Sequence, residues 1–95
     1  MFHLNVWLTV NDVEQVETIR ERLAQAAGMS RQEPGCVRFE VYHSQSDERR
    51  FLLAERWESK AAWETHRQGK AVTEIYVPQV LPHVEREPHV CSLLD

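Results

Sequence analysis

The stretch ERWESKAAWETH, residues 55–66, decides the fold, because it joins the end of one regular element to the start of the next. The apolar run FLLA directly before it predicts a β-strand that ends near Trp57. Ser59 is typical of a helix start, since its hydroxyl accepts an otherwise unpaired backbone N–H. His66 follows about two helical turns later. The stretch therefore predicts a strand, a tight turn and a helix that brings an imidazole back beside an indole.

The same patterns predict a regular order of elements along the whole chain. Strands are predicted at 2–10, 37–43, 51–57 and 89–95, and helices from Val13 to a stop at Gly28, from Ser59 to near Gly69, and at 71–77 before Pro78. Asp12 followed by Gln15 resembles a capping box at the start of the first helix. The order strand, helix, strand, strand, helix, short helix, strand is typical of a ferredoxin-like α+β fold. We expect one domain, residues 1–95, with a four-stranded antiparallel sheet and helices on one face.

The two faces of the predicted sheet differ in character. One face is apolar and should carry the helices; it holds Phe2, Leu4, Val6, Leu8, Val37, Phe39, Val41, Phe51, Leu53 and Trp57. The other mixes aromatic, aliphatic and charged side chains: Trp7, Tyr42, Leu52, Ala54, Arg38, Glu40 and Arg56. An open face with this much apolar surface usually finds a partner. A two-fold axis that pairs two such sheets would cover it, so we expect a homodimer.

Composition limits the classes of partner. The hydrophobic share of 42% and the charged share of 27% are ordinary for a soluble globular protein. A net charge of −4 and a pI near 5.7 argue against nucleic-acid binding, which needs a basic patch. No apolar run is long enough to span a membrane, and no signal peptide is visible at the N-terminus. We expect a cytoplasmic protein in which Cys36 and Cys91 stay reduced.

A family resemblance appears at this point. ERWESKAAWETH, preceded by EPGCVRFEVY at 33–42, resembles the antibiotic biosynthesis monooxygenase family, whose pattern is an E-P-G-C turn into a strand, a strand ending in E-x-W, and a short helix that carries a His. The resemblance implies a dimeric α+β barrel and places His66 on the recurrent helix histidine. It is less specific for the reaction, because the family includes quinol and polyketide monooxygenases, heme degraders and a sugar-phosphate isomerase.

His66 and Glu55 are the candidate catalytic residues. An imidazole titrates near neutral pH and so serves as base or acid, although a His that only packs on Trp57 would fit the same pattern. Glu55 lies in the apolar row between Leu53 and Trp57, where a carboxylate has to be paired or protonated. It is either an acid or base in a pocket, or half of a salt bridge with an Arg at the sheet edge.

Trp57, Tyr76 and His43 are the candidate substrate-binding residues. Trp57 could stack on a ring and donate its indole N–H, or lie in the core. Tyr76, on the short helix with Val72 and Ile75, could close the pocket and donate its hydroxyl, or serve packing alone. His43 ends its strand on the apolar face and is either a ligand contact or a satisfied strand-end residue.

No cofactor is expected. The five histidines are dispersed, without a spacing typical of a metal site, and three glycines do not provide a phosphate-binding loop. Heme-degrading relatives carry an Asn on the first strand, a Trp near the position of His66 and a His about ten residues later. Here Asn5 is present, but the downstream position is near Tyr76 and no His occurs in 67–82.

Three functions therefore stay open. The first is a cofactor-independent monooxygenase that acts with O2 on a small quinol, phenolic or anthrone-like substrate. The second is an isomerase or other proton-transfer enzyme on a small metabolite, which a polar pocket holding both Glu55 and His43 would favour. The third is a non-catalytic small-molecule-binding module, which a pocket filled by Trp57 and Trp63 would favour.

Overall fold

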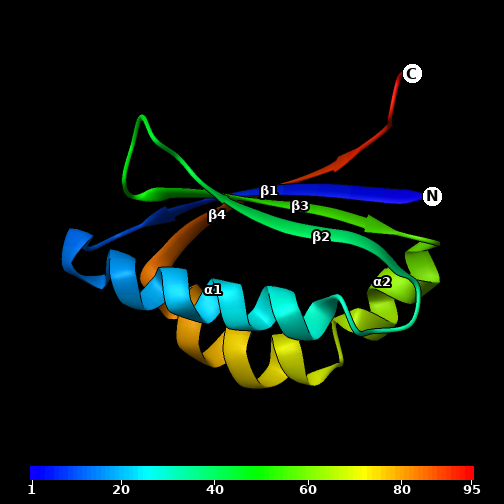
Figure 1. The fold of residues 1–95 in the computed structure, drawn as a ribbon, viewed down its shortest axis with the longest axis horizontal. Coiled ribbons are helices and arrows are strands. Elements are labelled where there is room, and N and C mark those ends of the chain that lie inside the picture. Colours follow the sequence, from blue (N-terminus) through cyan, green and yellow to red (C-terminus); the bar gives the residue numbers. More distant parts are fainter.

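The computed structural model describes residues 1–95 as one four-stranded antiparallel sheet with helices on a single face (Figure 1). The strands are β1 (Phe2–Val10), β2 (Cys36–His43), β3 (Arg50–Trp57) and β4 (Val84–Cys91), in the spatial order β2-β3-β1-β4. The helical segments are η1 (Val13–Gln15), α1 (Val16–Ser30), α2 (Lys60–His66), η2 (Ala71–Val80) and η3 (Leu81–His83). The predicted ferredoxin-like α+β fold is confirmed.

The core lies between the sheet and the helices, because β3 and, from His3 onward, β1 alternate between half-buried and buried residues. The side chains of Leu4, Val6, Leu8, Val10, Phe51 and Leu53 meet Ile19 and Leu23 of α1 and Val80 of η2. Figure 1 shows α1 and the yellow-to-orange η2 running side by side under the sheet. The opposite face of the sheet carries no element of the chain.

The turn into β2 is fixed by a close approach between backbone segments. Gly35 has φ of 82°, and a Cβ at this position would lie 2.6 Å from the Cβ of Ala62 on α2. Only glycine takes this conformation and this contact at low cost. The Gly35 carbonyl also accepts the N–H of Glu58 at 2.8 Å. The turn before β2 is thereby held directly against the start of α2.

Several predicted boundaries were wrong. The last strand is 84–91 and not 89–95, and it contains Pro88, which an edge strand tolerates because one of its sides has no ladder partner. Val37 is 50% exposed and does not join the apolar face, because the register between β2 and β3 shifts between Cys36 and Arg38. The first helix does not stop at Gly28.

The helix starts agree better with the sequence. Asp12 accepts the N–H of Glu14 at 2.9 Å, and Ser59 accepts the N–H of Ala62 at 3.1 Å. At the other end of α1, Ser30 donates its hydroxyl to the carbonyl of Ala26 within the last turn. No helix in the structure has the length and apolar character needed to cross a bilayer.

Candidate functional site

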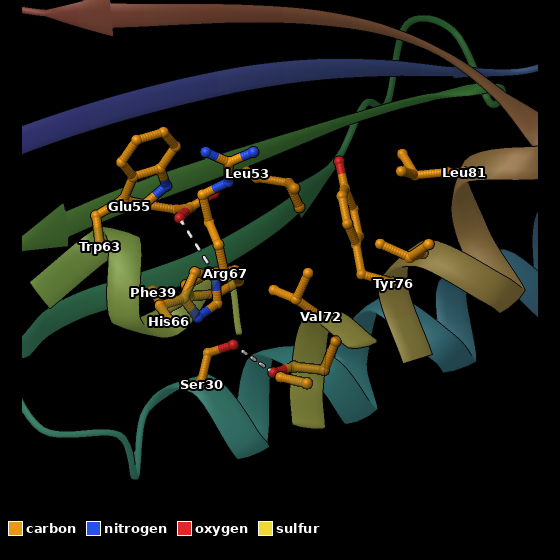
Figure 2. A pocket seen from close by; sticks show the side chains of 13 residues that line it. Ser30, Phe39, Leu53, Glu55, Trp63, His66, Arg67, Val72, Tyr76 and Leu81 are labelled. Atoms are coloured by element: carbon orange, nitrogen blue, oxygen red, sulfur yellow. Dashed lines mark hydrogen bonds and ion pairs between the residues drawn. The ribbon is translucent and has the colours of Figure 1, made fainter. Parts of the chain in front are cut away.

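A cavity of about 220 Å³ lies between the sheet and the helices, on the side where α2 meets η2 (Figure 2). Most of its lining is apolar, and its polar groups gather at the end nearest α2. The lining residues are Ala26, Ser30, Phe39, Leu53, Glu55, Trp63, His66, Arg67, Ala71, Val72, Tyr76, Val77 and Leu81. An apolar hollow with a few convergent polar groups is typical of a small-molecule site.

His66 is the last residue of α2 and points into the fold. Its side chain is 7% exposed, and its ring packs against the indole of Trp57 with centroids 4.4 Å apart. Phe39 of β2 lies on another side, with ring centroids 5.7 Å apart. Aromatic rings on two sides hold the imidazole in one orientation at the cavity wall.

Glu55 projects from β3 toward the same place and is 5% exposed. Its Oε1 accepts the indole N–H of Trp57 at 3.1 Å and lies 3.9 Å from Nε2 of His66. No arginine lies within salt-bridge distance of Glu55, so the structure does not show the edge salt bridge that the sequence left open. The carboxyl group is therefore buried with one neutral donor.

The environment of Glu55 makes its protonation state adjustable near neutral pH. Burial raises the pKa of Glu55 to about 7, and the Trp57 hydrogen bond and the charge of Arg86 offset only part of this effect. The Nε2–Oε1 distance of 3.9 Å is too long for a hydrogen bond, so desolvation dominates. A carboxyl group that titrates near pH 7 beside an imidazole is suited to proton transfer.

A second carboxylate lies on the far side of the imidazole. Oε1 of Glu33, from the turn between α1 and β2, lies 2.5 Å from Nδ1 of His66. The Glu33 side chain is 20% exposed and faces outward from the cavity. His66 is thus flanked by Glu33 at Nδ1 and by Glu55 toward Nε2.

The η2 segment forms the opposite wall, and its geometry differs from the predicted short helix. It continues through Pro78 to Val80 as a π-helix, and the N–H of Leu81 bonds to the carbonyl of Tyr76, five residues earlier. The cavity-lining residues on this side are Ala71, Val72, Tyr76 and Val77 of η2 and Leu81 directly after it.

Tyr76 lines the cavity from η2. Its hydroxyl accepts Nε of Arg86 on β4 at 3.1 Å. Burial raises the pKa of the Tyr76 phenol, and the neighbouring charge and hydrogen bond of Arg86 lower it in part. The phenol therefore stays protonated at neutral pH, with its proton free to be donated toward the cavity.

Trp63 and Arg67 close the cavity at the α2 end. Trp63 stacks on Phe2 with centroids 4.9 Å apart, and the guanidinium of Arg67 lies 5.1 Å from the centre of the Trp63 ring. The tryptophan therefore forms a wall and does not fill the hollow. Its position leaves the cavity open to an occupant.

The structure brings together three of the five candidate residues and separates two. His66, Glu55 and Tyr76 line the cavity, whereas Trp57 is fully buried behind the first two and reaches the site only through its bond to Glu55. His43 lies at the exposed end of β2, where it stacks on Phe51 and its Nε2 lies 2.7 Å from the carbonyl oxygen of Glu48. His43 is thus a satisfied strand-end residue, and the cavity does not combine it with Glu55.

Sequence reasoning missed Glu33 and Arg67 as parts of the site, and it considered Trp63 only as a side chain that would fill the pocket. Glu33 entered only as the first residue of the turn motif, and no local spacing links residue 33 to residue 66. Arg67 directly follows His66 and could have been included for that reason. No group of three His, Cys, Asp or Glu side chains is arranged as a metal site, and both cysteines are unpaired.

The arrangement can move a proton. The neutral imidazole has one acceptor nitrogen, and the lone pair faces the cavity when Nδ1–H is bonded to Glu33. Glu55 can hold or release a proton beside it. The largely apolar walls lower the local dielectric and strengthen the electrostatic effects of these groups.

Comparison with solved structures shows the same fold over nearly the whole chain. A conserved protein of unknown function from Bacteroides thetaiotaomicron, described as a possible oxidoreductase, has a TM-score of 0.88 at 21% identity and covers 97% of this chain and 96% of its own. A candidate antibiotic biosynthesis monooxygenase from Nitrosomonas europaea has a TM-score of 0.86 at 19% identity, with 98% and 99% covered. A protein from Shewanella oneidensis has a TM-score of 0.74 at 27% identity, with 96% and 93% covered.

Comparison at the level of sequence finds one family and no individual curated protein. The family described as antibiotic biosynthesis monooxygenase matches residues 1–76, which include β1 to β3, α1, α2 and most of η2, and so contain Glu33, Glu55, His66 and Tyr76. Because the match spans most of the sequence and the fold agrees from end to end, the chain belongs to the antibiotic biosynthesis monooxygenase family.

Proposed function

We propose that this protein is a cofactor-independent monooxygenase that oxidises a small aromatic substrate of the quinol, phenol or anthrone type. The observation that carries the proposal is the pair of buried groups, His66 and Glu55, facing an apolar cavity of about 220 Å³. Family membership supports a monooxygenase-type reaction. The aromatic substrate is inferred from the cavity itself.

The size and walls of the cavity favour a compact ring. An apolar cavity of about 150 Å³ is large enough to bind benzene, so this one suits a substrate of one or two rings. Trp63 and Phe39 offer flat aromatic surface, and the Tyr76 hydroxyl offers one donor to a substrate oxygen. These groups would orient the ring with its acidic O–H or C–H toward His66.

The chemistry needs a base and O2. Nε2 of His66 takes the proton from the substrate, which leaves an electron-rich phenolate or carbanion. This anion transfers one electron to O2, and the resulting substrate radical and superoxide combine into a peroxide. The base then removes the remaining proton from the carbon that carries the peroxide, the O–O bond breaks, and the protonated distal oxygen leaves as water, so that one oxygen atom stays on the substrate as a carbonyl. The substrate supplies all four electrons that O2 takes up, so no flavin or metal is required for the balance.

Each protein group has a role in this scheme. His66 is the base, and Glu55 supplies or stores a proton near neutral pH. Trp57 does not touch the substrate in this proposal; its indole N–H holds Glu55 in place. Exclusion of water by the apolar wall favours transfer of the electron to O2 over return of the proton from solvent.

The homodimer and the cytoplasmic location belong to the same proposal. The uncovered sheet face holds the exposed Tyr42 and the half-buried Trp7, and a second copy of the chain would cover them. Two unpaired thiols, Cys36 and Cys91, suit a reducing compartment.

An isomerase is the second candidate. The buried pair Glu55 and His66 could move a proton between two positions of a small metabolite without O2. The largely apolar lining and the absence of His43 from it favour the oxygenase. A non-catalytic binding module would use the same cavity without any role for the His66–Glu55 pair.

Oxygen uptake separates these functions. The purified protein is mixed with one- and two-ring quinols and with anthrone in metal-free buffer, and O2 is followed with an electrode. We expect uptake that is lost in Val72→Phe, which fills the cavity, and kept in Val13→Phe, which adds the same bulk at an exposed position. Solvent deuterium incorporation without O2 uptake would favour the isomerase, and tight ligand binding without either would favour the binding module.

A further inference from the structure

We propose that Glu33 is a positioning residue for His66, whose carboxylate fixes the imidazole in the tautomer with the proton on Nδ1 and the lone pair on Nε2, toward the cavity. The inference rests on the proposed function only in treating His66 as the base. The tautomer itself can be measured without turnover.

The contact geometry carries the assignment. Nδ1 of His66 and Oε1 of Glu33 are 2.5 Å apart, within hydrogen-bond distance. An ionised carboxylate accepts hydrogen bonds and donates none, so the proton of this bond belongs to Nδ1. In the neutral imidazole, Nε2 is then left as the acceptor. That atom lies 3.9 Å from Glu55 Oε1, too far for a direct hydrogen bond between them.

The fold holds Glu33 at this place through the main chain. Its N–H bonds to the carbonyl of Ser30 at 3.1 Å, and its own carbonyl accepts the N–H of Cys36 at 3.2 Å. The next residues form the turn whose Gly35 contacts Ala62 of α2. Glu33 is therefore tied to α1, β2 and the helix that carries His66.

A second glycine leaves room for the carboxylate. Gly69 follows α2, and a Cβ there would lie 2.6 Å from Oε2 of Glu33 and 3.3 Å from the carbonyl of His66. The first of these contacts is with the end of a flexible side chain, so an alanine at 69 would displace the Glu33 carboxylate more readily than it would disturb the fold. The lack of a side chain at Gly69 thus leaves space for the Glu33 carboxylate to reach Nδ1 of His66.

The charges around the imidazole agree with this role. Once His66 has taken a proton, Glu33 at Nδ1 stabilises the imidazolium, as the carboxylate of a catalytic triad does. The other groups facing this region are Glu55 on β3, Tyr76 on η2, Arg86 on β4 and Arg67 just after α2, so the fixed cations among them are Arg67 and Arg86. Because Glu33 is 20% exposed, it also links the buried ring to solvent and gives the proton a way out.

The tautomer is read by NMR of protein labelled with 15N at histidine, at a pH where the His66 ring is neutral. The His66 signals are assigned by their loss in His66→Gln. We expect the Nδ1–H form in the native protein and in Glu64→Gln, an exposed change on the same helix. We expect a shift toward the Nε2–H form in Glu33→Ala and in Gly69→Ala, which moves the carboxylate and keeps its charge.

Two results would overturn the assignment. One is an Nε2–H tautomer in the native protein, and the other is an Nδ1–H tautomer that persists in both Glu33→Ala and Gly69→Ala. If one of these variants fails to fold, the other decides the question.

Kinetics then tests the consequence for turnover. With an active substrate, Glu33→Ala should lower kcat on the order of 10²-fold with little change in KM, because substrate does not touch Glu33. Glu33→Asp should recover part of the loss. A native Nδ1–H tautomer that responds to Glu33, in a protein that consumes no O2, would support the positioning and reject the oxygenase. O2 uptake by a protein whose His66 tautomer does not respond to Glu33 would support the oxygenase and reject the positioning role.

Discussion

The indole N–H of Trp57 is donated to Oε1 of Glu55 over 3.1 Å, from a position two residues further along the same strand. Both side chains therefore leave β3 on the helix-facing side, and the larger one lies behind the smaller. This pairing makes Trp57 a part of the site that a ligand does not reach. It also ties the titration of Glu55 to a residue of the core.

We predict that Trp57→Phe raises the pKa of Glu55 further above about 7, because the hydrogen bond that it removes lowers that pKa. The loss of one partner of a buried pair should also cost about 1–3 kcal/mol of unfolding free energy. 13C NMR of the labelled Glu55 carboxyl would give the titration midpoint, and urea unfolding the stability. A midpoint that stays where it is would show that the indole bond does not act on this carboxyl.

We predict that the stability of the native protein falls as pH rises from about 4.5 to about 7. The folded-state pKa of Glu55 is raised to about 7 from 4.5, so the folded state holds a proton over this window that the unfolded state has released. The destabilisation is absent below about pH 4.5 and complete above about pH 7. It amounts to about 3 kcal/mol at most for a shift of this size.

The matched variant for this test is Glu55→Gln, which keeps an acceptor for Trp57 and does not titrate. The difference in unfolding free energy between the two proteins, measured by urea at a series of pH values, should grow in favour of Gln between pH 4.5 and 7 and then level off. Subtraction removes the contributions of His66, Glu33, Arg86 and Tyr76, the other ionisable groups nearby. A difference that is flat with pH would mean that Glu55 is ionised normally in the fold.

We predict that His66→Ala lowers kcat for an active substrate by about 10²–10⁴, the usual span for a lost general base. The fold and any dimer should persist, since the imidazole contributes less packing than Trp57 behind it. The pH–rate profile of the native protein should show a limb near neutrality to which Glu55, whose pKa is raised to about 7, contributes. Unchanged turnover would remove His66 from the mechanism.

We predict a homodimer that buries the sheet face holding Trp7 and Tyr42. Trp7 lies 4.5 Å below the guanidinium of Arg50 and Tyr42 is 47% exposed, so apolar area and charge alternate on this face. Sedimentation velocity at micromolar concentration should give the mass of two chains. Trp7→Asp should give monomer with reduced stability, whereas Val13→Asp, an exposed change away from the sheet face, should leave the dimer intact.

We predict that the purified protein holds no stoichiometric metal and no flavin, and that added heme gives no sharp Soret shift of the kind caused by His ligation. The reasons are the dispersed histidines and the lack of a glycine-rich loop. Elemental analysis and the absorption spectrum are sufficient measurements. Metal at one equivalent per chain, or a yellow preparation, would contradict the proposed chemistry.

Most of the fold could be predicted from the sequence, because helix caps and strand alternation are local sequence patterns. Ser59 caps α2, and β1 and β3 alternate along their whole length, so the strand and helix that carry Glu55 and His66 follow from short patterns. The predicted bounds of β4 were wrong because Pro88 is typical of irregular chain. An edge strand tolerates a proline, but the sequence does not show that β4 is an edge strand, since this depends on the order of strands in the sheet. That order is a property of the whole fold.

The site could be predicted only in part, because some of its contacts join residues far apart in the sequence. His66, Glu55 and Tyr76 each stood out as a polar residue within an apolar pattern. Glu33 did not, because its contact with His66 joins residues 33 positions apart through the packing of a turn on a helix. Trp57 was noticed as a large aromatic residue. Sequence spacing does not tell whether it lines the cavity or lies behind Glu55, because that depends on tertiary packing.

The wide turn of η2 ties the shape of the cavity to the length of this segment. A π-helix closes its hydrogen bonds over five residues where an α-helix closes them over four, and here Tyr76 and Val77 of η2 and Leu81 just after it line the cavity. Deleting Pro78 would let the segment relax to the α-helical period and turn Leu81 toward a different neighbour. A change of one residue in the length of this segment would then alter the shape of the cavity without any substitution at His66 or Glu55.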